Sequence, residues 1–89
     1  MKYDPDMPIA SDDEVYPPSD DSILLIESLD VHPGEHVLEI GCGSGIVSVH
    51  CAANGCEVVA GDINPRAVST ARETARLCGV SMDVVETDV

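Results

Sequence analysis

Aromatic residues are nearly absent from this sequence, whose 89 residues contain no phenylalanine or tryptophan and only two tyrosines, Tyr3 and Tyr16. A hydrophobic core must therefore be built mainly from Val, Ile, Leu, Ala and Cys side chains. A chain of this length forms one small domain at most, and such a domain buries only a modest share of its surface. No apolar run approaches the roughly 20 residues that span a bilayer, so we expect no membrane partner.

Basic residues are also scarce, because four lysines and arginines stand against 17 aspartates and glutamates, for a formal net charge of −13. A surface of this charge repels phosphate backbones, which excludes non-specific nucleic-acid binding. The acids are spread along the whole chain. This distribution favours a general acidic surface, of the kind that keeps proteins of salt-adapted organisms soluble, over a dedicated basic partner.

No pair of the four cysteines has Cys-x-x-Cys spacing, and no spacing of metal ligands repeats among the cysteines and histidines, so we expect no metal site. The acidic, Pro-rich start has no apolar segment of the signal-peptide type. We therefore expect free thiols and a cytoplasmic protein.

Residues 1–18 carry four prolines and five acids, and this composition predicts an extended acidic arm, in contrast to the folded residues 19–89. A helix is predicted over 19–30, with Ser19 as its N-cap. Strands and helices then alternate. The predicted elements are a strand at 35–40, a helix at 44–54, a strand at 57–61, a helix from Pro65 to Cys78 and a strand at 82–86.

This order predicts an α/β fold: a Rossmann-like parallel sheet with flanking helices and right-handed crossovers. Three parallel strands have two faces to cover and too few helices to cover them. We therefore interpret the chain as the front part of a larger domain, with an incomplete sheet.

A glycine loop, Gly41-Cys42-Gly43-Ser44-Gly45, lies between the first predicted strand and the helix that follows it. Glycines suit a tight turn that a ligand approaches closely. A phosphate-binding P-loop is excluded, because the loop lacks Gly-Lys-Ser/Thr. A dinucleotide fingerprint has glycine where this chain has Ile46, which counts against NAD and FAD.

Three acids, Glu39, Asp62 and Asp88, stand at the carboxyl ends of three successive predicted strands. Open α/β sheets bind their ligands at this edge. Glu39 suits the sulfonium and ammonium groups of S-adenosylmethionine, Asp62 can accept both ribose hydroxyls, and Asp88 can accept from an adenine amino group. Taken singly, each is also compatible with a solvated edge or helix-start acid. Cys42 has no paired base nearby, so we expect a small loop residue and no catalytic nucleophile.

Residues 37–45 resemble the first motif of class I S-adenosylmethionine-dependent methyltransferases, residues 61–65 the second motif, and Asp88 the acid of the third. Residues 14–22 resemble the segment Val-Tyr-x-Pro-x-Glu-Asp-Ser/Thr of HemK-like protein methyltransferases of the archaeal and eukaryotic type. Asp20 stands where that group usually has glutamate. The resemblance covers about residues 14–89.

The resemblance implies three strands of a seven-stranded methyltransferase fold, with S-adenosyl-L-methionine as the cofactor. It implies N5-methylation of the glutamine in the Gly-Gly-Gln motif of a peptide chain release factor, with a small activating subunit as a further partner. The cofactor-binding residues that resemblance and loop together indicate are Ser22, Glu39, Gly41, Gly43, Gly45, Asp62 and Asp88.

The Asn-Pro-Pro-Tyr motif that holds the acceptor amide in this group is absent from the 89 residues, so we expect no catalytic residue here and an inactive chain on its own. Three alternatives stay open: a methyltransferase for a nucleobase, small molecule or other protein side chain; a non-catalytic nucleoside-binding module; and a dehydrogenase-like NAD site, because Asp62 also suits an NAD ribose.

Overall fold

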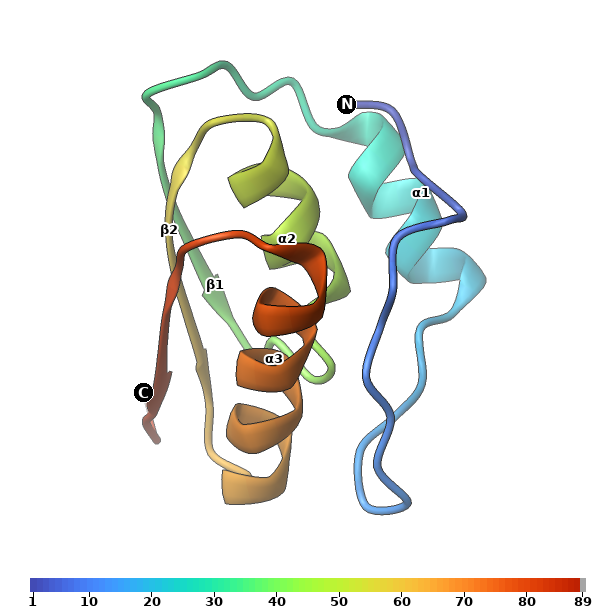
Figure 1. Ribbon diagram of the computed structural model, residues 1–89, viewed down its shortest axis with the longest axis vertical. Coiled ribbons are helices and arrows are strands. Elements are labelled where there is room, and N and C mark those ends of the chain that lie inside the picture. The colour runs from blue at the N-terminus through green and yellow to red at the C-terminus, as the bar shows by residue number, and fades with distance from the viewer. Residues whose placement is uncertain (89) are drawn as a thin grey trace.

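The computed structural model describes residues 1–88, which form three layers (Figure 1). A parallel sheet forms the first layer, and α2 (Ile46–Ala53) and α3 (Pro65–Cys78) cover one of its faces. The third layer consists of α1 (Asp20–Ser28) and the arm, residues 1–18. The predicted helices and strands are confirmed, with ends that differ from the predictions by at most two residues.

The sheet contains β1 (His36–Ile40), β2 (Glu57–Asp62) and β3 (Asp83–Glu86) in the order β1-β2-β3, all parallel. Ile40 pairs with Gly61, and Gly61 pairs in turn with Val85, so the strands end close to one level. Their carboxyl ends form the lower edge of the molecule in Figure 1, where the glycine loop and the start of α3 also lie. The parallel α/β fold predicted from the element order is confirmed.

Local signals in the sequence account for the bounds of α3. Asn64 Oδ1 accepts a hydrogen bond from Arg66 N at 3.0 Å, Pro65 occupies the first helical position, and Gly79 ends the helix at a φ of +67°. Each is the residue type that its position favours, because Asn caps free amides, Pro needs no amide partner and Gly adopts the left-handed conformation without strain.

The core is made of small aliphatic and sulfur-containing side chains, as the lack of Phe and Trp requires. One cluster lies between α1, α2 and the sheet and includes Ile26, Cys51 and Val58. A second lies between α3 and the sheet and includes Val68, Ala71 and Val84. The described cysteines are free thiols, and three of the four are buried.

The other face of the sheet is uncovered by any described residue, although parallel sheets are usually covered on both sides. Leu38 is 68% exposed, and Ile40, Val59 and Val85 on the same face are also exposed. Side chains alternate between the two faces, so the same strands bury Val58, Ala60 and Val84 under the helices.

The arm lies along α2 and α3 and makes specific contacts with them, although it contains no helix or strand. Asp4 N donates to His50 Nε2 at 3.0 Å, and Ala10 N donates to Thr74 Oγ1 at 3.0 Å. Tyr3 stacks on the buried His50 ring at a centroid distance of 5.5 Å. The division into an arm and a folded part stays a prediction, but the contacts show that this arm packs on the helices. No helix among residues 1–88 is long and apolar enough to cross a membrane.

Candidate functional site

The glycine loop leaves β1 and enters α2 through three left-handed residues, Gly41 at φ +78°, Gly43 at +55° and Gly45 at +86°. Side chains other than hydrogen are strained in this conformation. A Cβ atom on Gly41 or Gly43 would point into open space, whereas one on Gly45 would lie 3.1 Å from Ala71 Cβ. The first two glycines therefore keep a surface open, and the third permits close packing of the loop on α3.

The backbone amides of the loop are largely committed to acceptors within the protein. Gly41 N and Cys42 N both donate to Gly61 O, at 2.7 and 3.0 Å, and Gly45 N donates to Cys42 O at 2.9 Å. Gly43 N donates to Asp62 Oδ2 at 3.0 Å. A loop that binds phosphate needs such amides free to face the ligand. Contacts with the end of β2 therefore hold the loop in shape. The loop suits a ligand that it touches through van der Waals contacts, without hydrogen bonds from its amides.

A cavity of about 300 Å³ opens between the glycine loop and the end of the arm. Glu39, Gly41 and Gly43 line one wall. Tyr16, Pro17 and Pro18 line the opposite wall, and α1 adds residues that include Asp21, Ser22 and Leu25. The cavity therefore joins two segments of the chain that both carry the resemblance to methyltransferase motifs.

The charged residues that line this cavity are both acidic, Asp21 and Glu39. Glu39 accepts a hydrogen bond from Ser48 Oγ. Burial raises the pKa of the Glu39 carboxyl above its ordinary value, while the Ser48 hydrogen bonds oppose the rise and the nearby Asp62 adds to it. A cationic ligand group beside Glu39 would offset this cost of ionisation. The cavity thus suits a cation better than a phosphate.

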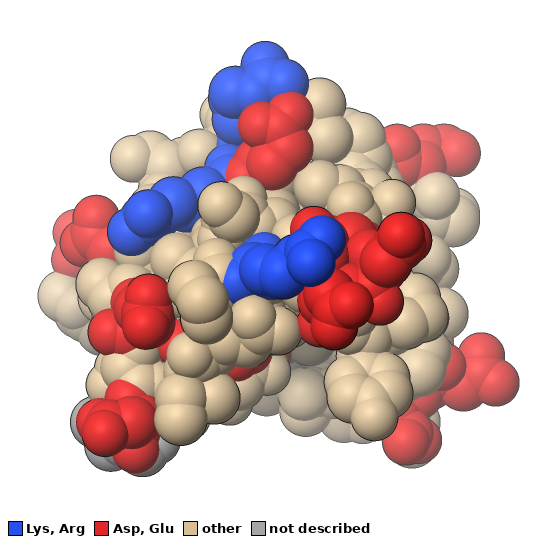
Figure 2. Space-filling model, turned by 90° about the horizontal axis from the view of Figure 1, so that it is seen from below, with Lys and Arg blue, Asp and Glu red and all other residues tan. Residues whose placement is uncertain are grey.

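The face at the carboxyl ends of the strands carries acidic side chains around its rim (Figure 2). Two arginines are paired with acidic side chains. Arg66 pairs with Asp12, with Nε 3.0 Å from Oδ1, and Arg76 pairs with Glu73 on the same helix. These two arginines are therefore already neutralised by carboxylates, which leaves the face unfavourable for polyanions.

Cys42 is buried in the loop, and its thiol is not activated. Burial, followed by the nearby Glu39 and Asp62 carboxylates, raises the pKa of Cys42 to about 11. The thiol therefore stays protonated near pH 7, and thiolate is the nucleophilic form. This agrees with the sequence-based interpretation of Cys42 as a small loop residue.

The structure distributes the seven residues predicted to bind the cofactor over several positions. Ser22, Glu39, Gly41 and Gly43 line the cavity. Asp62 lies behind the loop, where Oδ2 accepts from Gly43 N and Oδ1 accepts from Asn64 N at 2.9 Å. Gly45 is buried against Ala71 and serves packing.

Asp88 is exposed and lines a different cavity of about 350 Å³, together with Ile63, Glu86 and Thr87. The two cavities share the carboxyl edge of the sheet, and Thr87 N donates to Asp62 O at 3.0 Å. Asp62 thus stands between the loop and the end of β3. The cofactor-binding roles of all seven residues stay predictions.

Two features of the site were missed by the sequence reasoning. Ser48, in the first turn of α2, donates from Oγ to Glu39 across nine residues, a contact that no local spacing in the sequence indicates. Tyr16, Pro17 and Pro18 were noted for their resemblance but were not predicted to line a cavity. Composition and periodicity do not predict where such an irregular segment packs in the fold.

A scan against protein-family models matches residues 11–89 to the family described as methyltransferase small domain. A protein of Methanocaldococcus jannaschii, named only provisionally as a protein N5-glutamine methyltransferase, is 46% identical over 77 residues, which are 85% of this chain and 39% of that protein. The ribosomal protein L11 methyltransferase of Symbiobacterium thermophilum is 49% identical over 55 residues, which are 61% of this chain and 18% of that one.

Solved structures share the fold. The C-terminal domain of precorrin-6Y C5,15-methyltransferase from Rhodobacter capsulatus matches with a TM-score of 0.80 and 24% identity, over 97% of this chain and 47% of that one. The tRNA (uracil-54, C5)-methyltransferase of Pyrococcus abyssi, solved in complex with S-adenosyl-L-homocysteine, matches with a TM-score of 0.68 and 22% identity, over 76% of this chain and 18% of that one.

The chain spans less than half the length of each of these four proteins or domains. The comparisons confirm the family and the Rossmann-like fold predicted from the glycine loop and the strand-end acids, and they agree with the predicted cofactor. This chain belongs to the methyltransferase small domain family.

Proposed function

We propose that this chain is the cofactor-binding part of an S-adenosylmethionine-dependent protein methyltransferase that acts on a glutamine side-chain amide. One observation supports the cofactor assignment above all others. The cavity beside the glycine loop is lined by the acids Asp21 and Glu39, without a lysine or arginine, and the amides of the loop glycines donate to acceptors within the protein. Such a site disfavours a pyrophosphate and favours a ligand that carries positive charge.

The residues present fit S-adenosylmethionine. Glu39 is held by Ser48 and can accept from the ammonium group or lie beside the sulfonium. Gly41 and Gly43 leave the space where a Cβ atom would otherwise stand. Asp62 uses one acceptor position on each carboxylate oxygen for Gly43 N and Asn64 N, and a carboxylate offers about four such positions. The remaining positions can accept ribose hydroxyls.

S-adenosylmethionine, when bound, supplies a methyl group activated by the sulfonium. The chain holds the donor and keeps phosphate-bearing nucleotides away. An amide nitrogen is a weak nucleophile, so the main catalytic need is to hold it in line with the methyl–sulfonium bond. Within this proposal, residues outside the described cavity provide that alignment, and the small activating subunit implied by the resemblance assists them.

The acceptor assignment is supported by two likenesses that overlap in the chain. Residues 14–22 resemble the HemK-like segment, and the provisionally named N5-glutamine methyltransferase of Methanocaldococcus jannaschii is 46% identical over the aligned region. The L11 methyltransferase likeness favours a protein acceptor in general and supports glutamine less, since that relative aligns over a shorter stretch.

Calorimetric titration of the chain with S-adenosylhomocysteine and with NAD tests the cofactor assignment. We expect binding of the first only. Replacing Glu39 by Gln removes one charge-assisted contact, worth about 1.5–3 kcal/mol, and should weaken binding roughly 10-fold to 100-fold. Arg76→Met, which removes a charge paired with Glu73 away from the cavity, is the matched control and should bind as the wild type does. Tighter binding of NAD would contradict the assignment.

Whether this chain can present the cofactor to an amide acceptor is tested with a chimera in which it replaces the aligned 77-residue segment of the Methanocaldococcus jannaschii relative. Methyl-labelled S-adenosylmethionine is supplied with a Gly-Gly-Gln peptide, and a Gly-Gly-Glu peptide serves as the control without an amide. We expect label on the glutamine peptide alone. Parallel reactions contain L11 or tRNA in place of the peptides, and label on either of them with none on the glutamine peptide would contradict the proposed acceptor.

A further inference from the structure

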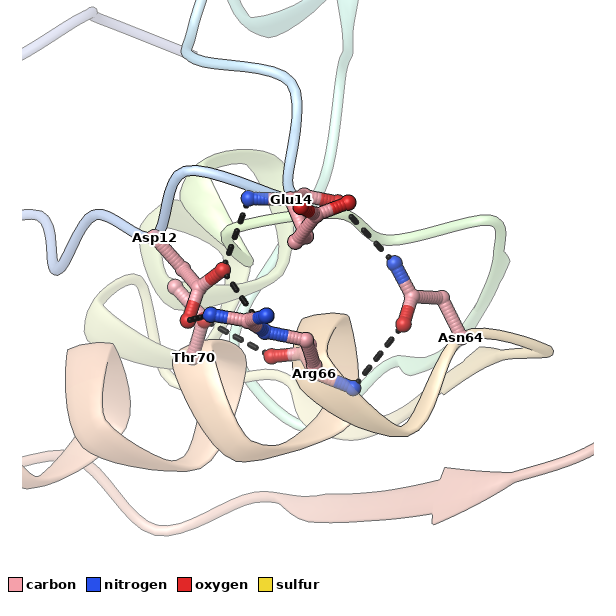
Figure 3. A network of polar contacts seen from close by, with 5 residues as sticks. All are labelled: Asp12, Glu14, Asn64, Arg66 and Thr70. Carbon is pink, nitrogen blue, oxygen red and sulfur yellow. Dashed lines mark hydrogen bonds and ion pairs between the residues drawn. The ribbon is translucent and has the colours of Figure 1, made fainter.

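The arm is fastened to the start of α3 at two points (Figure 3). Arg66 holds the Asp12 carboxylate with both arms of its guanidinium, Nε to Oδ1 at 3.0 Å and Nη2 to Oδ2 at 3.1 Å. Asn64 Nδ2 donates to Glu14 O at 3.1 Å. Asp12 Oδ1 also accepts from Glu14 N at 2.8 Å, which closes a turn in the arm and aims its next residues.

These contacts hold the arm immediately before the residues that form one wall of the cavity. Tyr16, Pro17 and Pro18 follow Glu14 directly and line the cavity opposite the glycine loop. The two prolines have a fixed φ, so this segment is stiff, and its position follows from where it is attached. Tyr16 itself is 94% exposed and has little packing to hold it. The fastening at Asp12 and Glu14 therefore fixes this wall at its N-terminal end, while α1 fixes it from Ser19 onward.

The same junction holds the opposite wall. Asn64 N donates to Asp62 Oδ1 at 2.9 Å, and Asp62 Oδ2 accepts from Gly43 N at 3.0 Å. Residues 62–66, which connect β2 to α3, thus contact the glycine loop through Asp62 and the arm through Asn64 and Arg66. The hydrogen-bonded path from one wall of the cavity to the other passes through this junction.

We propose that Arg66 and Asn64 are positioning residues for the cofactor: together with Asp12 they set the arm wall of the cavity at the distance from the glycine loop that the cofactor needs. The proposal rests on the proposed function. Neither side chain lines the cavity, so both act through the arm. The pair between Arg66 and Asp12 is bidentate, and Asp12 is 25% exposed, which favours a defined geometry over a loose surface contact.

Three substitutions separate this role from support of the helix. Arg66→Met removes the ion pair, and Asp12→Asn removes it from the arm side while keeping an acceptor for Glu14 N. Asn64→Asp keeps the N-cap of α3, since Asp caps as well as Asn, and removes only the donor to Glu14 O. Arg76→Met is the matched control, because it removes the same charge from the same helix but breaks a pair that does not reach the arm.

Calorimetry with S-adenosylhomocysteine gives the first readout. Solvent screens an ion pair with partly exposed partners, so Arg66→Met and Asp12→Asn should each weaken binding by only about twofold to fivefold. The double variant should bind no more weakly than either single one, since both remove the same pair. Arg66→Lys should recover part of the affinity, and Arg76→Met should leave it unchanged.

Quenching of Tyr16 fluorescence by acrylamide gives the second readout, which loss of stability alone does not move. A Tyr3→Phe background leaves Tyr16 as the only fluorophore, because the chain has no Trp. At saturating S-adenosylhomocysteine the ligand should shield Tyr16 in this background. With Arg66→Met added, acrylamide should quench Tyr16 equally well with and without saturating S-adenosylhomocysteine.

The outcomes are distinct. Equal binding by Arg66→Met and Arg76→Met, or additive losses in the double variant, overturns the positioning role while leaving the cofactor assignment intact. A wild-type chain that binds no S-adenosylhomocysteine overturns the proposed function and this inference with it. If circular dichroism shows that Arg66→Met does not fold, Asp12→Asn, which leaves α3 untouched, decides the matter by the same two readouts.

Discussion

Gly43 and Gly45 of the loop should respond differently to the same substitution by alanine. Gly45→Ala forces a side chain into a φ of +86° and brings its Cβ within 3.1 Å of Ala71 Cβ and 3.2 Å of Ala71 Cα. The left-handed conformation costs about 1–2 kcal/mol for a non-glycine residue. Overpacking against backbone that cannot easily move adds about 1–3 kcal/mol. The expected loss of stability is thus about 3 kcal/mol.

A loss of this size is large for a chain of 89 residues. One kcal/mol shifts the melting temperature of such a domain by about 4–8 °C, so Gly45→Ala should lower it by roughly 12–24 °C. Gly43→Ala also has a positive φ, of +55°, but its Cβ meets nothing within 4 Å. We expect Gly43→Ala to lower the stability by only about 1–2 kcal/mol and to lower the melting temperature by less than Gly45→Ala does.

Ligand binding should be weakened more by Gly43→Ala than by Gly45→Ala. The Cβ of Gly43→Ala projects from the loop on the wall that lines the cavity, so S-adenosylhomocysteine should bind much more weakly although the protein is folded. Circular dichroism melts and calorimetry at a temperature where both variants are folded measure the two effects. The reasoning is refuted if the two variants melt alike, or if Gly43→Ala binds as tightly as the wild type.

Three further predictions concern charge and thiol chemistry. Burial holds the pKa of Glu39 above its ordinary 4.5, so its contribution to the free energy of unfolding is highest below pH 4.5 and decreases as the pH rises through the raised pKa. Glu39→Gln should reduce this pH dependence and raise the melting temperature of the ligand-free chain at pH 7. Unchanged melting curves would contradict this prediction. Because the pKa of Cys42 is about 11, iodoacetamide at pH 7.5 should modify it far more slowly in the folded chain than in guanidinium, as read by mass spectrometry, and equal rates would count against a buried thiol. With a net charge of −13, the melting temperature should rise in molar KCl, and salt-independent melts would remove the inference of salt adaptation.

The sequence predicts most of the fold because its signals are local. Asn64, Pro65 and Gly79 each act within one turn of α3, and the alternation of strands and helices leaves few topologies for a parallel sheet. The glycine loop was found for the same reason, since its function depends on residues adjacent in the chain. Glu39 precedes the loop by two residues and therefore shares its wall of the cavity.

The position of the arm was out of reach of such reasoning. Its contacts join backbone amides to distant side chains, as Asp4 N joins His50 across 46 residues and Ala10 N joins Thr74 across 64. No periodicity or propensity encodes a pair of this kind. A Pro-rich acidic composition is common to free arms and to arms that dock, so the composition left the two possibilities undistinguished.

The three strand-end acids lie at two neighbouring cavities for a geometric reason, and their shared role in cofactor binding stays a prediction. In the order β1-β2-β3 the third strand lies two positions from the first, which at about 4.8 Å per strand separates their ends by about 10 Å. Asp88 lies beyond the end of β3 and faces a neighbouring cavity, while Glu39 faces the first one. Asp62 ends the middle strand and lies between the two, in contact with Gly43 of the loop and with Thr87 beyond β3.

Mapping of S-adenosylhomocysteine binding onto the backbone amides by nuclear magnetic resonance tests the central claim most directly. A ¹⁵N-labelled chain titrated with the ligand should show its largest shifts at Gly41, Gly43 and Ser22, with smaller ones at Tyr16 and Asp62. This pattern would place the methyl donor between the glycine loop and the arm. Shifts confined to Ile63 and residues 86–88, or none at saturating ligand, would contradict the account.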